Sequence, residues 1–336
     1  MRRFLPTAPI APAVLIASLI AVFAAALPAF PAQAADGASW SVAPADTEQG
    51  TARPNFDYAM DPGQTLADAY AVRNDGATPL TLRVYASDAF TTREGNIDLL
   101  PAAEPASDAG TWVRLDVDQV TLQPGETSVI PFTVTAPADA RPGDHVAGIL
   151  ASITSADPTA EVQVDRRLGT RMYIRLSGEL TPAVQLSEPV VEFTGGWNPL
   201  AVGNLTVRYT LQNTGDTRVT ALSALSASGP FGAAATSTAD VQLPEVLPGS
   251  EIDVVHELTG VGALLWLAGG IDVRPSSVGI GAAALDAQLL DYSVAAVPFG
   301  TLAVLLLVAL VVLVTLLVVR RRRAASARST AAPAAR

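Results

Sequence analysis

Several residue types are missing or scarce in this chain of 336 residues, which contains no cysteine, no lysine and only two histidines. Without cysteine there are no disulfides, no lipid-modified cysteine anchor and no cysteine-ligated zinc. The folded parts must therefore be stabilised by hydrophobic cores alone, which is feasible for two domains of ordinary size. The composition excludes the small disulfide-rich class of exported protein.

Catalytic and cofactor-binding motifs are also absent. His145 and His256 each fall inside a predicted strand without a partner constellation. There is no G-x-S-x-G nucleophile motif and no glycine-rich phosphate loop. Asp116 and Asp118 share one strand face but lack the glycine and the terminal glutamate of a calcium-binding EF-hand loop. We therefore predict a protein that is not an enzyme and has no cofactor.

Charge, glycine and proline are absent from one long apolar run, Thr301–Val319, which is followed at once by Arg320, Arg321, Arg322 and Arg323. Such a run is long enough, at helical rise, to cross the hydrocarbon core of a bilayer. Arginines beside a membrane helix favour the cytosolic side. The sequence predicts a transmembrane helix over 298–319 and a cytosolic basic tail over 320–336, disordered from Ala324.

The first residues are typical of a secretory signal peptide over residues 1–34. Arg2 and Arg3 precede the apolar stretch Ile10–Phe30, and an A-x-A pattern predicts cleavage between Ala34 and Ala35. The arginine pair follows Met1 directly and lacks the rest of a twin-arginine signal, which favours general secretion. Together with the basic tail, this predicts a single-pass type I protein of the cell membrane, with its bulk outside and its C-terminus in the cytosol.

The exported part is strongly acidic. All 32 acidic residues lie between Ala35 and Val297 against 13 arginines, a net charge of −19. A polyanion repels nucleic acid and anionic lipid headgroups. We therefore expect no nucleic-acid partner, and a membrane partner only through the one helix.

Short alternating runs separated by turn chemistry predict an all-β fold of two tandem immunoglobulin-like sandwiches, over residues 35–181 and 182–297, followed by the helix. Two turns of the first half recur in the second, which favours a repeated plan. The matching stretches are Val72–Gly76 with Leu211–Gly215, and Leu122–Glu126 with Leu247–Glu251.

Three stretches are less regular. Val184–Phe193 is predicted as one strand. Arg171–Leu176 can close the first sandwich with Val162–Val164 or open the second. Val261–Ile271 is too short to span a bilayer, which leaves a buried strand broken by glycine or a hairpin that touches the membrane.

If the apolar residues at every second position of a strand face inward, aromatic and arginine side chains remain on the outward strand faces. Flat rings stack on sugars, and guanidinium groups bond to carboxylates or peptide carbonyls, so such a face can bind a ligand. Cross-strand packing on an outer face explains the same pattern without one. The candidate ligand-binding residues are Tyr85, Trp112, Arg114, Arg171, Tyr173 and Arg175.

The order of motifs over about Ser39 to Leu176 resembles the WxL-interacting protein family of bacterial surface proteins, particularly its peptidoglycan-binding domain. The similarity is faint over Val184–Val297, where that family has a second, host-binding domain. The motifs, in order, are Phe56-Asp57-Tyr58, Pro62-Gly63-Gln64, Val72-Arg73-Asn74, Thr121-Leu122-Gln123-Pro124-Gly125-Glu126, Pro137, and Pro142-Gly143-Asp144-His145-Val146-Ala147-Gly148-Ile149.

The resemblance implies attachment to peptidoglycan and contact with partner surface proteins that carry WxL motifs. The chain contains no W-x-L tripeptide, so it would be the interactor. We predict a membrane-anchored, extracellular, cell-wall-associated binding protein. The alternative is an accessory or spacer subunit of a membrane transport or secretion assembly, in which the helix makes specific contacts.

Overall fold

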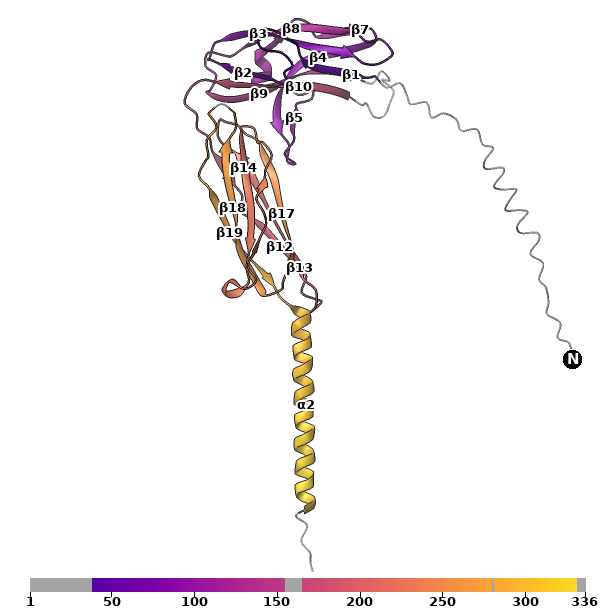
Figure 1. The fold of residues 1–336 in the computed structure, drawn as a ribbon, viewed down its shortest axis with the longest axis vertical. Helices are drawn as coiled ribbons and strands as arrows, with labels where there is room; N and C mark the ends of the chain where they lie inside the picture. Colours follow the sequence, from indigo (N-terminus) through magenta and orange to yellow (C-terminus); the bar gives the residue numbers. More distant parts are fainter. Residues whose placement is uncertain (1–37, 155–164, 280, 331–336) are drawn as a thin grey trace, which may run out of the picture.

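The computed structural model describes residues 38–154, 165–279 and 281–330. The predicted signal peptide, with its cleavage site at Ala34 and Ala35, lies outside these residues. The described part consists of strands, two short 3-10 turns and one C-terminal helix, which confirms the all-β class. Figure 1 shows the strands in two bodies, called here the N-terminal sandwich (residues 40–176) and the C-terminal sandwich (residues 184–296), with helix α2 leading away from the second.

The N-terminal sandwich is built from two sheets, with strand orders β1-β3-β8-β6 and β2-β10-β9-β4-β5, and β7 also pairs with β4. Its elements are β1 (Trp40–Pro44), β2 (Phe56–Met60), β3 (Thr65–Asn74), β4 (Leu80–Thr91), β5 (Ile97–Leu99), η1 (Ala109–Trp112), β6 (Val113–Leu115), β7 (Gln119–Leu122), β8 (Thr127–Thr135), β9 (Gly143–Thr154) and β10 (Asp165–Leu176). β10 pairs antiparallel with β9 and parallel with β2, so Arg171–Leu176 belongs to this sandwich.

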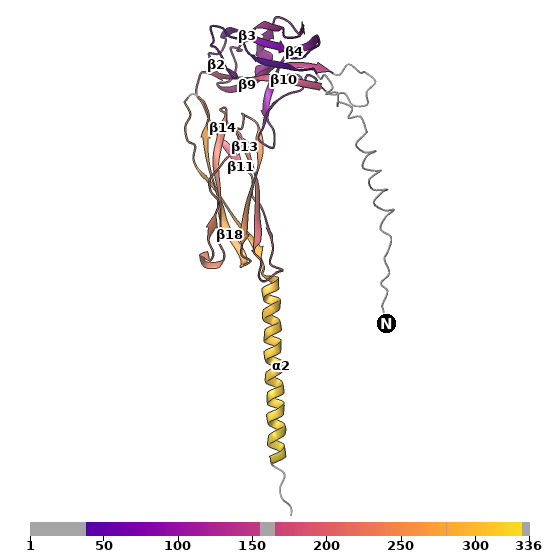
Figure 2. The same ribbon diagram turned by 45° about the vertical axis from the view of Figure 1, so that its right-hand side comes forward.

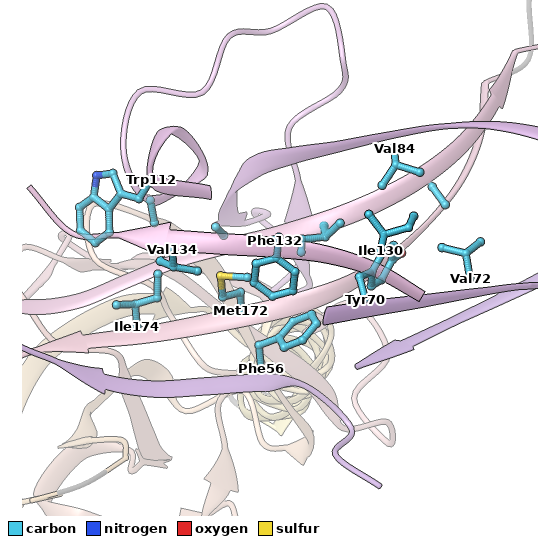
Figure 3. Packing of buried hydrophobic residues seen from close by; sticks show 14 of the residues in the cluster. Phe56, Tyr70, Val72, Val84, Trp112, Ile130, Phe132, Val134, Met172 and Ile174 are labelled. Atoms are coloured by element: carbon cyan, nitrogen blue, oxygen red, sulfur yellow. The ribbon is translucent and has the colours of Figure 1, made fainter. Parts of the chain in front are cut away.

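The core of the N-terminal sandwich follows from strand alternation. Leu80, Leu82 and Val84 of β4 point inward and are buried, while Thr81 and Arg83 between them are exposed. Figure 3 shows aromatic rings from both sheets meeting at the centre of this core. The rings of Phe56 and Phe132 meet edge to face with their centroids 5.1 Å apart, an arrangement that adds to the stabilisation from burial alone.

The C-terminal sandwich has one sheet of order β11-β13-β12 with β17 beside β13, and a second of order β15-β14-β18-β19 with β16 beside β14. Its core holds a separate cluster of buried apolar residues. Its elements are β11 (Val184–Leu186), β12 (Val190–Thr194), β13 (Gly203–Asn213), β14 (Val219–Ala227), η2 (Pro230–Gly232), β15 (Thr236–Ser237), β16 (Val241–Gln242), β17 (Glu251–Val261), β18 (Leu265–Ser277) and β19 (Gln288–Ala296).

Two strand predictions are wrong in detail. Val184–Phe193 is not one strand, because Pro189 separates β11 from β12 and cannot donate a ladder hydrogen bond. Val261–Ile271 is not a single strand broken at its glycines: Val261 ends β17, residues 262–264 connect the two strands, and β18 begins at Leu265 and continues through Gly269 and Gly270. Leu267 and Ile271 are buried in the core as a strand requires, whereas Leu265 and Trp266 remain exposed beside the turn.

The repeated turns make the same hydrogen bonds in both sandwiches. The Asn74 side-chain amide donates to the carbonyls of Thr78 (2.8 Å) and Leu122 (3.0 Å), and its oxygen accepts from the Gly76 backbone N–H (2.9 Å). Asn74 is fully buried at the end of β3 and joins its own turn to the one that follows β7.

Asn213 makes the equivalent hydrogen bonds in the C-terminal sandwich. Its amide donates to the carbonyls of Thr217 (2.7 Å) and Val246 (2.8 Å), and its oxygen accepts from Gly215 N–H (3.1 Å). The resemblance between the turn sequences is therefore a resemblance of structure, centred on one buried asparagine in each sandwich.

Helix α2 (Phe299–Thr330) follows β19 after only Val297 and Pro298. Among the described residues, this helix alone is long and apolar enough to cross a membrane, over Phe299–Arg323 with a mean hydropathy of 3.5 in an 18-residue window, and that window is exposed throughout. The Thr315 hydroxyl donates to the Val311 carbonyl (2.8 Å), which satisfies the polar group within the helix. The helix continues through the four arginines, so the prediction of disorder from Ala324 is wrong as far as Thr330.

Figures 1 and 2 show the N-terminal sandwich lying across the end of the C-terminal sandwich that is farthest from α2. β5 projects from it toward the C-terminal sandwich in both views. The N-terminal sandwich is thus the body farther from α2, and a junction joins it to the C-terminal sandwich.

Candidate functional site

The β4–β5 turn fastens the two sandwiches together. The Thr91 backbone N–H donates to the Ser250 hydroxyl (3.1 Å), and the Thr91 hydroxyl accepts from the Leu247 backbone N–H (3.0 Å). Arg93 next to it forms ion pairs with Glu251 and Asp253. Because these contacts combine backbone and side-chain groups of both bodies, the junction has a defined geometry.

A buried carboxylate, Asp144 at the start of β9, organises the junction. It accepts hydrogen bonds from the Arg175 Nε (2.7 Å) and from the Arg218 backbone N–H (2.7 Å), and its side chain is 2% exposed. Arg218 comes from the C-terminal sandwich, and its guanidinium also bonds to Glu245 (3.1 Å). The hydrogen bond from Arg175 to Asp144 raises the pKa of the arginine. The positive charges of two arginines are thus balanced by the negative charges of two carboxylates, in an interface from which water is partly excluded.

A cleft of about 640 Å³ lies beside Asp144, between the two sandwiches. Its volume is in the range of about 300–1,000 Å³ typical of ligand pockets. Its accessible polar groups include the carboxylates of Asp108 and Asp216 and several uncharged donors and acceptors, so it can bond to hydroxyl, amide and amino groups. The lining residues are Asp108, Arg141, Pro142, Asp144, His145, Thr181, Gln212, Asn213, Thr214, Gly215, Asp216, Pro248 and Gly249.

His145 forms part of the cleft wall, and both of its ring nitrogens have hydrogen-bond partners. Nδ1 lies 2.8 Å from both carboxylate oxygens of Asp108, and Nε2 lies 2.9 Å from the Arg141 carbonyl oxygen. Since both neighbours are acceptors, only the doubly protonated ring satisfies both contacts. Burial, the largest single influence, lowers the pKa of His145, but the hydrogen bonds to Asp108 and Arg141 and the charge of Asp108 outweigh it and leave the pKa above 6.5. The ring of Trp112 packs on the imidazole with centroids 4.6 Å apart.

The predicted row of Arg171, Tyr173 and Arg175 does lie on the outer face of β10, but other parts of the chain occupy that face. Arg171 donates to the Ile97 carbonyl of β5 (3.3 Å), and Arg218 lies 4.3 Å above the Tyr173 ring. Arg175 bonds to Asp144 and to the Val278 carbonyl. Tyr173 and Arg175 are therefore half-buried beneath the C-terminal sandwich and do not lie on an open sheet face, whereas Arg171 remains exposed.

The other three candidates are scattered. Trp112 ends the 3-10 turn η1 and belongs to the hydrophobic core, so its placement on an outward strand face is wrong. Tyr85 is half-buried, with the Arg83 guanidinium 5.3 Å from its ring, while Arg114 is exposed on β6. Only Trp112 borders the cleft region, through its contact with His145.

Sequence reasoning missed the residues that build the cleft. Asp144 stands in the motif Pro142–Ile149, but that motif does not show that Asp144 pairs with Arg175 across β9 and β10. The signal that could have found this pair is an acidic residue and an arginine at the ends of neighbouring predicted strands. Asp216 gave no such signal, because its partner Thr181 lies 35 residues earlier and donates both its backbone N–H (2.9 Å) and its hydroxyl (2.8 Å) to the Asp216 carboxylate.

Comparison with protein families supports the resemblance found in the motifs. Residues 41–152 match the family described as WxL Interacting Protein, peptidoglycan binding domain. The match covers most of the N-terminal sandwich, including Asp108, Arg141, Asp144 and His145 of the cleft. No curated protein matches the sequence.

Solved structures with a similar arrangement include bacterial fimbrial chaperones. The class 5 fimbriae chaperone CfaA is 12% identical, with a TM-score of 0.37 over 75% of this chain and 99% of that chain. The Escherichia coli chaperone DraB is 11% identical, with a TM-score of 0.31 over 76% of this chain and 98% of that chain. A chain of the Salmonella enterica SafA pilin in complex with the chaperone SafB is 11% identical, with a TM-score of 0.32 over 76% of this chain and 96% of that chain. No functional statement follows from these similarities.

Proposed function

We propose that this chain, whose residues 41–152 match the peptidoglycan binding domain of WxL interacting proteins, is a non-enzymatic, cell-wall-associated surface protein that binds peptidoglycan. That match is the observation that carries the proposal. The candidate span Phe299–Arg323 supports anchoring in the cell membrane, with the sandwiches outside and the C-terminus in the cytosol. The family description also supports a WxL-type surface protein as a partner.

The cleft beside Asp144 is the site we propose for peptidoglycan. Five of its lining residues come from the matched segment, and four of these belong to the Arg141–His145 stretch. Peptidoglycan offers hydroxyl, acetamido, amide and amino groups, for which carboxylate and amide side chains are suitable partners. The cleft also draws on residues of the C-terminal sandwich, so binding would depend on both bodies being in place.

Retention of the full-length protein on purified cell-wall sacculi tests this proposal. Arg141→Ala and Asp108→Asn alter two cleft side chains, and Arg114→Ala removes an exposed arginine of β6 outside the cleft. We expect the two cleft variants to lose most of their retention and Arg114→Ala to keep it. Unchanged thermal unfolding of each variant would confirm that the fold is intact.

Two other outcomes would separate the parts of the proposal. If the native chain and all three variants are retained equally, the peptidoglycan site lies elsewhere on the N-terminal sandwich. A native chain that does not sediment with sacculi would contradict peptidoglycan binding itself. The alternative of a subunit in a transport or secretion assembly draws no support from the comparisons.

A further inference from the structure

The strand register brings three loops of the C-terminal sandwich to the end from which α2 leaves. Leu265 of β18 pairs with Ala296 of β19, and Gly203 of β13 pairs with Val261 of β17. A bridge between Ser228 and Ala268 brings the end of β14 to the same level. We call residues 195–202, 228–235 and 262–266 the tip; Figures 1 and 2 both show this end of the sandwich beside the start of α2.

Large apolar side chains are exposed on every loop of the tip. Leu200 is 95% exposed, Trp197 is 77% exposed and Phe231 is fully exposed at 108%. Leu265 and Trp266 at the start of β18 are about half exposed. Exposed apolar residues that gather in one place mark a contact surface, whereas scattered ones do not.

The tip also lacks charge in a chain whose exported part is otherwise acidic. The stretches 193–207, 219–239, 258–271 and 292–319 contain no Asp, Glu or Arg. These four stretches are far apart in sequence, but the register brings their loops together at one end of the sandwich. Charge is thus excluded from the tip and from residues 299–319 of α2 alike, as a low-dielectric surrounding requires.

The backbone holds two of the exposed side chains in an unfavourable conformation. Phe231 has φ 57° and Leu265 has φ 78°, a left-handed region that bulky residues rarely adopt. Such strain persists only where the surrounding structure holds it, and it gathers at functional positions. Here it directs apolar side chains outward from the sandwich.

The tip is fastened to the first turn of α2. The Gly300 backbone N–H donates to the Gly196 carbonyl (2.8 Å), and the rings of Trp197 and Phe299 stack with centroids 5.0 Å apart. A Cβ at Gly196 would collide with the Val297 carbonyl, and one at Gly300 with the Trp197 carbonyl. The two glycines therefore allow a close approach that couples the sandwich to the helix without a flexible linker.

We propose that the tip inserts into the outer interfacial layer of the bilayer and holds the C-terminal sandwich upright on the membrane. The apolar run after Gly300 fills a hydrocarbon core of about 30 Å, which places Phe299 and the Trp197 ring at the headgroup level. Tryptophan and other aromatic side chains favour that layer. The proposal rests on α2 being a membrane span, and it does not depend on peptidoglycan binding.

Single-cysteine labelling of the full chain in lipid nanodiscs tests the insertion, because the native sequence has no cysteine. Exposed alanines provide matched positions: Ala201→Cys and Ala235→Cys at the tip, and Ala287→Cys at the opposite end of the sandwich. Ala309→Cys in the middle of α2 reports on the span itself. Each variant carries a nitrobenzoxadiazole label, and quenching is measured with nitroxide-bearing lipids and with aqueous iodide.

We expect the labels at 201, 235 and 309 to lose fluorescence with nitroxide lipids, and the label at 287 to lose it only with iodide. The triple substitution W197A/F231A/W266A should restore the fluorescence at 235 and leave the label at 309 quenched. A label at 235 that behaves like the one at 287 would overturn the proposal. So would protection of 235 from both quenchers, which would indicate a protein partner on the tip, and so would an unquenched label at 309, which would show that α2 does not span.

Discussion

At the scale of single residues, the junction depends on one carboxylate that two arginines of different sandwiches share. Asp144 is almost inaccessible to water, so its desolvation is offset only by its hydrogen bonds to Arg175 and Arg218. Removing the carboxylate leaves two guanidinium groups in a partly dry interface with one fewer counter-charge.

Asp144→Asn should therefore lower the free energy of unfolding by about 3–5 kcal/mol. Asp75→Asn is the matched control, because Asp75 pairs with Arg73 on the exposed surface and such pairs contribute at most about 1 kcal/mol. Denaturant unfolding in detergent, followed by tryptophan fluorescence, measures both. Equal effects of the two substitutions would contradict the role given to Asp144.

The two histidines should affect stability in opposite directions with pH. The pKa of His145 is raised, so its contribution is complete below pH 6.5 and is lost as the pH rises through the folded-state pKa. Burial lowers the pKa of His256, whose Nε2 lies 2.8 Å from the Ser223 hydroxyl oxygen. The contribution of His256 to stability is therefore present above pH 6.5 and is lost as the pH falls.

Comparing the native chain with His145→Gln and His256→Gln at pH 5.5 and 8.5 measures these contributions. The stability difference caused by His145→Gln should be larger at pH 5.5, and the difference caused by His256→Gln should be larger at pH 8.5. Because Asp108 is half exposed, solvent screening keeps the first effect modest. The same pH trend in both variants would refute the assignment.

At the scale of elements, the fold uses the same turn device twice. Asn74 and Asn213 each join the turn after one strand to the turn after another through three side-chain hydrogen bonds. The bonds to the carbonyls of Leu122, Thr217 and Val246 are buried, so these carbonyls would be left without partners if the amide were removed, whereas the bond to Thr78 is only partly buried.

Asn74→Ala and Asn213→Ala should each destabilise the chain by on the order of 3 kcal/mol. Asn96→Ala on the exposed β4–β5 turn serves as the control and should change little. Hydrogen exchange would show which part opens: faster exchange is expected in β3 and β7 for the first variant and in β13 and β17 for the second. Uniform exchange across both sandwiches would mean that the two turn networks are not independent.

At the scale of the whole molecule, Figure 1 shows the N-terminal sandwich at the end of the C-terminal sandwich opposite α2. The cleft is lined by residues of both sandwiches, so under the proposed function it lies on the side of the cell wall while the tip lies at the membrane. The proposed orientation rests on the four arginines after the apolar run.

Protease added to protoplasts should digest both sandwiches and leave a fragment that contains α2 and a C-terminal tag. The tag should become accessible only after the membrane is permeabilised. Loss of the tag from intact protoplasts, with the sandwiches spared, would reverse the proposed orientation.

The sequence alone determined the all-β class, the apolar span and the repeated turns, because alternation, run length and turn chemistry are local. Leu80, Leu82 and Val84 follow the strand period, and Asn74 and Asn213 stand in similar turn sequences. The resemblance of the N-terminal sandwich also rests on motifs that can be read in order along the chain.

Only the tertiary structure decided which outward faces are free. Tyr173 and Arg175 alternate outward as predicted, but Arg218 and Val278 of the other sandwich cover them. Trp112 is buried because the chain turns at η1 instead of extending. Partners that meet from positions 35 to 103 residues apart leave no local pattern, so neither the cleft nor the tip could be found from periodicity.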